Sequence, residues 1–166
     1  MSTTRRSNEV TIVAGEDVPT ITITREFDFP REQVWRAMTD PELVAQWMGP
    51  RAVTMRIEHW DLRRGGSWAY AATDCTNGDE FTTFYGSFHD VRPPERAVQT
   101  FTWEGAPDGV SLETLTLTEL PGGRTRMTTL GVVESFEIRD AILSSGMELG
   151  VVEGYEQLDE LLAEPR

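Results

Sequence analysis

Apolar and polar residues alternate through most of the chain, and a period of two is typical of strands with one buried face. Residues 20–29 show it first, with Ile21, Ile23, Phe27 and Phe29 at odd positions. The alternation returns after residue 52, in segments bounded by glycine, proline or Asn-Gly turn signals. Consecutive strands joined by tight turns predict an antiparallel meander. Its first strand begins at residue 52, and the following strands cover residues 67–75, 81–91, 97–104, 112–120 and 124–133.

Two short helices are predicted between the first strand and the meander. Pro30 suits the first position of a helix, where a missing N–H leaves no bond unmade. Asp40 is typical of a cap for the second helix, which Pro41 begins and Gly49-Pro50 ends. The apolar positions at helical spacing are Val34, Trp35 and Met38 in the first helix and Leu43, Val44 and Trp47 in the second.

Residues 137–163 are predicted to form one helix of about 27 residues, roughly 40 Å long. Its apolar stripe consists of Met147, Val151, Tyr155, Leu158 and Leu162. A column of glycines (Gly146, Gly150 and Gly154) runs beside this stripe. Each glycine costs about 1 kcal/mol relative to alanine, so we expect the helix either to approach the sheet closely there or to leave space.

The order of elements predicts an α+β fold with one curved antiparallel sheet. A chain of 166 residues is of single-domain size. We divide it into a flexible N-terminal arm over residues 1–19, with a short apolar patch that could add an edge strand, and one domain over residues 20–163.

Charge and cysteine content narrow the classes of function. Acidic residues outnumber basic ones by 28 to 15, and a net charge of −13 repels phosphate backbones and anionic lipids. Nucleic acid and membrane insertion are therefore not expected. The single cysteine, Cys75, cannot form an internal disulfide. With no apolar run of about 20 residues and no signal peptide, we expect a cytoplasmic protein.

Several motifs together resemble the START/birch-pollen-allergen superfamily (SRPBCC). Within it the chain is similar to the branch named after the activator of the heat-shock-protein-90 ATPase. The resemblance covers about residues 20–163 and implies a helix-grip fold, in which the sheet wraps the C-terminal helix around an apolar cavity. It rests on residues 29–35, 39–43, 47–50, 61–68, 91–96, 100–103 and 122–127.

Large apolar side chains on the predicted strand faces and on the final helix are candidates for lining this cavity. Such a set gives an apolar pocket suited to a small molecule. The same side chains could instead fill a solid core, since aromatics dominate cores generally. The candidates are Trp47, Trp68, Tyr70, Phe84, Phe101, Trp103, Met127, Met147 and Val151.

Polar groups inside the cavity could orient a ligand or transfer a proton. Among His89, Tyr85, Glu113, Glu148 and Arg126, we expect Tyr85, His89 and Glu148 as polar cavity residues. They could instead lie on a solvated face. We assign no catalytic residue and no cofactor. No metal is expected either, because the two histidines and the cysteine show no ligand spacing.

Three functions remain open from the sequence. The preferred one is binding of a small hydrophobic or aromatic molecule in the cavity. The second is a polyketide-cyclase-like enzyme, which needs a base and an oxyanion donor to converge inside. The third is a protein-interaction module such as a chaperone-ATPase activator, which needs an exposed apolar patch. A homodimer is compatible with each.

Overall fold

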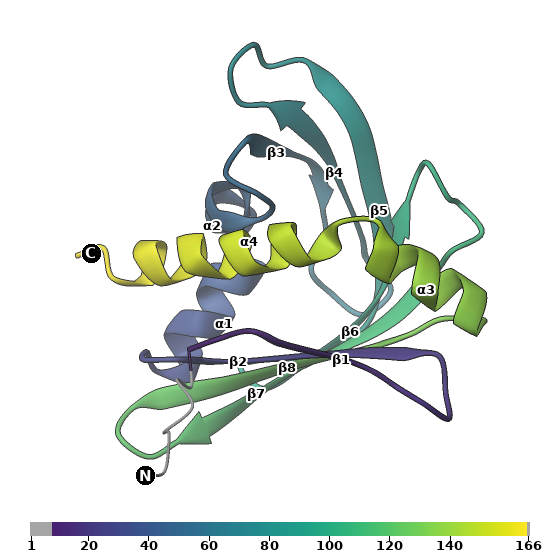
Figure 1. Ribbon diagram of the computed structural model, residues 1–166. Coiled ribbons are helices and arrows are strands. Elements are labelled where there is room, and N and C mark those ends of the chain that lie inside the picture. Colours follow the sequence, from purple (N-terminus) through teal and green to yellow (C-terminus); the bar gives the residue numbers. More distant parts are fainter. Residues whose placement is uncertain (1–7, 166) are drawn as a thin grey trace, which may run out of the picture.

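One curved antiparallel sheet and a layer of helices on its inner side make up the structure, a computed structural model that describes residues 8–165 (Figure 1). The strands are β1 (Thr11–Ala14), β2 (Thr20–Phe27), β3 (Val53–Trp60), β4 (Ser67–Asp74), β5 (Glu80–Arg92), β6 (Arg96–Trp103), β7 (Ser111–Leu120) and β8 (Arg124–Val132). The helices are α1 (Arg31–Thr39), α2 (Pro41–Trp47), α3 (Phe136–Ser144) and α4 (Met147–Leu162).

The sheet order is β1-β2-β8-β7-β6-β5-β4-β3. Strands β3 to β8 follow one another as antiparallel neighbours, which confirms the predicted meander. Strand β2 pairs with β8 along its whole length, from Thr20 opposite Val132 to Phe27 opposite Thr125. Strand β2 thus extends the sheet at the β8 end of the meander, β3 forms the opposite edge, and the α+β helix-grip class is confirmed.

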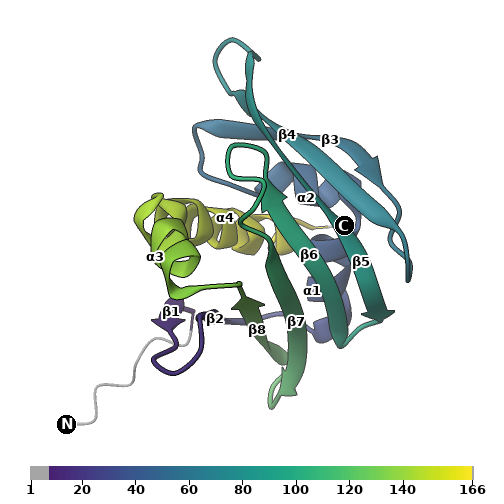
Figure 2. The ribbon, with the colours of Figure 1, turned by 90° about the vertical axis from the view of Figure 1, so that its right-hand side faces the viewer.

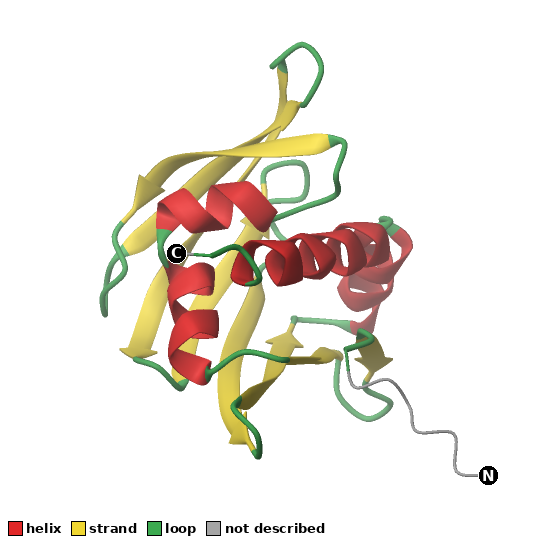
Figure 3. Ribbon diagram, turned by 90° about the vertical axis from the view of Figure 1, so that its left-hand side faces the viewer, coloured by secondary structure: helices red, strands yellow, loops and turns green. Residues whose placement is uncertain are grey.

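The two short helices after β2 form as predicted. The Asp40 side chain accepts a hydrogen bond from the Glu42 backbone N–H at 3.0 Å and so caps α2. Pro41 occupies the first turn, where no N–H is needed. The helices α1, α2 and α4 lie together over one face of the sheet (Figure 3).

The C-terminal segment differs from the prediction of one helix over residues 137–163. It forms two helices, α3 and α4, separated at Ser145 and Gly146. Gly146 has φ +86°, a left-handed conformation that glycine adopts without strain and that ends a helix. No side chain of α3 is buried, and α3 lies next to the β1–β2 hairpin, where the Arg139 guanidinium donates to the Gly15 carbonyl (Figure 2).

The remaining glycines of α4 pack against the segment that follows α2 rather than against the sheet. A Cβ on Gly154 would lie 3.4 Å from the Gly49 nitrogen, and one on Gly150 would lie 3.4 Å from Cδ of Pro50. The Gln157 side chain adds hydrogen bonds to the carbonyls of Trp47 and Gly49. The glycines therefore permit close packing of helix α4 on the end of helix α2.

The arm predicted over residues 1–19 is structured in part. Residues 11–14 form the edge strand β1, paired with β2 from Thr11 opposite Thr24 to Ala14 opposite Ile21. Residues 1–7 of the predicted arm lie outside the described residues.

The buried apolar residues form two clusters. The first joins α1, α2 and the C-terminal half of α4 to β2, β7 and β8, and includes Phe27, Leu117, Met127 and Leu158. The second lies under β3, β4 and β5 and includes Met55, Trp68, Tyr70 and Phe88. The N-terminal part of α4 and all of α3 contribute no buried residue to either cluster.

Candidate functional site

A row of side chains crosses the concave face of the sheet between the two clusters. The strand register places Phe88, Gln99, Glu113, Gly131 and Ile21 side by side on β5, β6, β7, β8 and β2. Residues directly opposite each other on neighbouring strands point to the same face. On β2, Phe27 points to the same face as Ile21 of this row. The Tyr155 ring of α4 packs edge-on against Phe27, at 6.0 Å between ring centroids, so this is the face that α4 covers.

Glu113 is the ionisable group in this row. Burial raises the pKa of its carboxyl from 4.5 to about 7, and a hydrogen bond from Gln99 Nε2, at 3.3 Å, offsets only part of that effect. The residue as a whole is nevertheless only half-buried. Glu113 is therefore enclosed by protein but not completely covered. Groups with strongly shifted pKa values are frequent at functional sites.

Two tyrosine hydroxyls face the same region from opposite sides. Burial raises the pKa of Tyr70, on β4, and the pKa of Tyr155, on α4. The negative charge of Glu113 adds to both increases, so both hydroxyls lie within its electrostatic reach. Tyr155 is also hydrogen-bonded to the Thr129 side chain. Both tyrosines stay protonated at neutral pH and can act as hydrogen-bond donors.

Aromatic rings form the wall of the concave face next to Glu113. Trp68 and Tyr70 stack at 5.0 Å between centroids, and Phe101 lies 5.5 Å from both Trp68 and Phe84. Phe84 and Phe101 keep accessible surface. The buried indole N–H of Trp68 has no hydrogen-bond partner within residues 8–165. An unpaired buried donor is costly, which makes a polar group from outside the chain a favourable neighbour.

Gly131 leaves the middle of the row without a side chain. A Cβ there would lie 3.0 Å from the Ser111 hydroxyl, a close contact, and 3.6 Å from the Ile21 carbonyl, while the glycine itself is half-buried. The backbone of the sheet is therefore partly accessible immediately beside Glu113.

The residues expected to line a cavity fall into three groups. Trp68, Tyr70, Phe84 and Phe101 lie together on the aromatic wall, and Met147 and Val151 are half-buried on α4. Trp103 is 45% exposed at the end of β6, opposite Phe84.

Trp47 and Met127, by contrast, belong to the packed first cluster. Met127 has no exposed surface, and Trp47 donates its indole N–H to the Ala37 carbonyl at 2.8 Å while stacking on Tyr155. For these two residues the alternative of a solid core is the correct one.

The expectation that Tyr85, His89 and Glu148 are polar cavity residues is wrong, because all three are exposed. Tyr85 follows the inward-facing Phe84 and so points to the convex side. His89 lies at an irregularity of the β5–β6 register, and Glu148 lies in the first turn of α4.

Glu113 was considered but not selected as a cavity residue from the sequence. A signal for it exists in the alternation of β7, where Leu115 and Leu117 face the helices and Glu113 shares their parity.

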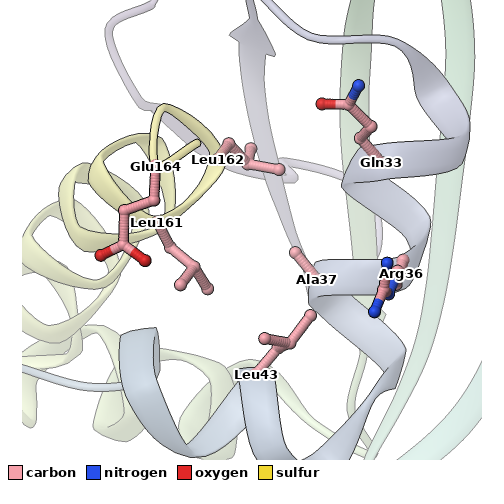
Figure 4. A pocket seen from close by; sticks show the side chains of 7 residues that line it. All are labelled: Gln33, Arg36, Ala37, Leu43, Leu161, Leu162 and Glu164. Carbon is pink, nitrogen blue, oxygen red and sulfur yellow. The ribbon is translucent and has the colours of Figure 1, made fainter. Parts of the chain in front are cut away.

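Two surface depressions lie elsewhere on the helices. The first, of about 260 Å³, is lined by residues of α1, α2 and the end of α4, with Ala37, Leu43 and Leu161 around one space (Figure 4). The second, of about 390 Å³, lies between α2 and β3 beside Trp60. Neither contains residues of the row around Glu113.

None of the helices within residues 8–165 is both long and apolar enough to span a bilayer. No group of three or more His, Cys, Asp or Glu side chains in that part of the chain is placed to hold a metal ion.

Comparison with known proteins identifies relatives over nearly the whole chain. The model of the activator of Hsp90 ATPase homolog 1-like protein family matches residues 28–163. A crystal structure of a protein from Rhodobacter sphaeroides is 28% identical, with a TM-score of 0.83, and covers 93% of this chain and 99% of its own. A search of the curated proteins finds no match.

Two further structures agree with this result. A protein from Mycobacterium smegmatis is 29% identical with a TM-score of 0.82, over 95% of this chain and 99% of its own. The solution structure of a protein from Arthrobacter aurescens is also 29% identical, with a TM-score of 0.83, over 93% of this chain and 92% of its own. The chain thus belongs to the activator of Hsp90 ATPase homolog 1-like family, within the START/SRPBCC superfamily.

Proposed function

We propose that this protein binds a small hydrophobic or aromatic molecule between the concave face of its sheet and helix α4. The observation that carries the proposal is the row around Glu113. There, a half-buried glycine leaves the sheet backbone partly accessible, and the neighbouring Glu113 is half-buried with an enclosed carboxyl. The aromatic wall of Trp68, Phe84 and Phe101 borders this opening.

The energetics favour an apolar ligand with few polar groups. Each ligand CH₂ removed from water contributes about 0.8 kcal/mol, and the aromatic rings offer most of the contact area. Glu113, Tyr70 and Tyr155 supply the polar groups that fix the orientation of a bound molecule.

Helix α3 and the start of α4 suit the entrance of such a site. They contribute half-buried apolar residues but no fully buried one, so moving them exposes little core. Gly146, between the two helices, has the backbone freedom that a hinge requires.

Proton transfer is the second candidate function. A carboxyl with a pKa of about 7 next to two protonated tyrosine hydroxyls has the pKa that a general base needs at neutral pH. In the cyclase-like hypothesis, Glu113 would then act as the base instead of Tyr85, His89 or Glu148. Turnover that disappears in Glu113→Gln would favour this candidate over simple binding.

Calorimetric titration with 2-naphthylmethanol, a neutral aromatic probe, tests binding. We expect saturable binding to the native protein and at least tenfold weaker binding to Gly131→Leu, because the new side chain fills the uncovered part of the concave face. Thr128→Leu is the matched control, since it adds the same side chain to the convex face of the same strand. Absence of binding, or equal binding to both variants, would contradict the proposal.

A further inference from the structure

We infer that the ligand carries a cationic amino group, held by the Glu113 carboxylate and by the faces of the neighbouring aromatic rings. This inference rests on the proposed function and adds the chemical class of the ligand. It follows from three features of the concave face: an unneutralised carboxyl, a wall of aromatic rings and, among residues 8–165, no positively charged group that faces this carboxyl.

Glu113 forms no ion pair within residues 8–165. Its one hydrogen-bond partner there is the neutral amide of Gln99, and the effects that set its pKa are burial and this hydrogen bond. A carboxylate enclosed in this way loses hydration without gaining a counter-charge, which is unfavourable unless a partner is supplied. A ligand cation would supply that partner.

The basic group that reaches this region from β2 is already paired. Arg25 of β2 reaches Tyr155 electrostatically, but its guanidinium forms a 2.6 Å ion pair with Asp159 and lies over the Phe27 ring. The other groups that face Glu113 are Gln99 from β6, Tyr70 from β4 and Tyr155 from α4. None of them carries a positive charge, so an anionic ligand would meet only like charge at Glu113.

The aromatic wall adds to the attraction for a cation. The faces of tryptophan, tyrosine and phenylalanine rings carry partial negative charge, and a desolvated cation gains substantially from them. Phe101 lies two residues from Gln99 on β6, diagonally across from Glu113. Trp68, which contacts Phe101, is itself only 2% exposed, whereas Phe101 keeps accessible surface, so the carboxylate and the Phe101 ring can contact one small group together. The net charge of −13 also raises the local concentration of cations.

The test compares two probes that differ only at the polar group: 2-naphthylmethylamine and 2-naphthylmethanol. At pH 8 we expect the amine to bind at least ~10-fold more tightly, as for a buried charge-assisted hydrogen bond. We expect Glu113→Gln to abolish this preference while the alcohol still binds. Glu32→Gln is the matched control, because it removes an equal charge from an exposed position on α1 and should leave the preference unchanged.

The native protein provides a second test that needs no variant. Lowering the pH from 8 to 5.5 protonates Glu113 but leaves the amine charged, so the amine should lose about tenfold in affinity and the alcohol should not. If neither probe binds, the proposed function itself is wrong. If the alcohol binds but the amine has no advantage, or keeps it in Glu113→Gln, only the present inference is overturned.

Discussion

Among single residues, Glu113 is expected to lower the stability of the fold above neutral pH. Its folded-state pKa of about 7 exceeds its ordinary value of 4.5, so the folded protein holds this proton more tightly than the unfolded chain. No penalty exists below the ordinary pKa. The penalty grows as the pH rises towards 7 and is complete above it.

Glu113→Gln removes this penalty. We expect the variant to have a higher free energy of unfolding than the native protein at pH 8, by at most ~3 kcal/mol, and a much smaller advantage at pH 5. Urea denaturation at both pH values measures the difference. An equal effect at the two values would show that Glu113 ionises freely in the folded state.

Neighbouring residues on β5 distinguish the two faces of the sheet. Phe84 contacts Tyr70 and Phe101 on the concave face, whereas Tyr85 is 45% exposed on the convex face. We expect Phe84→Ala to lower the free energy of unfolding by roughly 2 kcal/mol and Tyr85→Ala by less than about 1 kcal/mol. Similar losses, measured by chemical denaturation, would contradict this assignment of faces.

The sequence located the aromatic wall but not the polar group beside it. Phe84 and Phe101 follow from alternation, because large apolar residues in a strand almost always face the interior. Tyr85 and His89 were misplaced because the sequence did not decide which face of residues 81–91 points inward. Glu113 required the inference that a charged residue follows the parity of Leu115 and Leu117 into the interior.

Among the elements, the break between α3 and α4 is the main departure from expectation. The pattern of residues 137–163 is helical throughout, and a glycine inside such a pattern can either continue or end a helix. Gly146 ends α3 in the left-handed conformation, while Gly150 and Gly154 continue α4. Local sequence does not distinguish these roles, because contacts with the segment after α2 decide them.

Substitution of two glycines tests this assignment. Gly146→Ala should lower the free energy of unfolding by about 1 kcal/mol, because alanine is strained at φ +86°. Gly150→Ala should leave it unchanged or raise it, since alanine favours the helix and its Cβ would make only a 3.4 Å contact with Pro50. Thermal denaturation of both variants measures the effect; the reverse order would mean that the helix is continuous.

At the scale of the whole molecule, the fold was largely predictable because its strands are consecutive. Each hairpin is specified by its own turn signal, and the pairing of β2 with β8 adds the first strands at one end of the meander. The grouping of side chains around Glu113 was not predictable. It depends on residues from β4, β6, β7, β8 and α4 that meet only in the folded state.

The location of a bound aromatic molecule decides whether the concave face is a binding site. Intermolecular nuclear Overhauser effects between 2-naphthylmethanol and the isotope-labelled protein report it. We expect contacts with Phe84, Phe101, Gly131 and Val151. Contacts confined to the depression around Leu43 and Leu161, or no contacts at a saturating concentration, would show that the space between sheet and α4 takes no ligand.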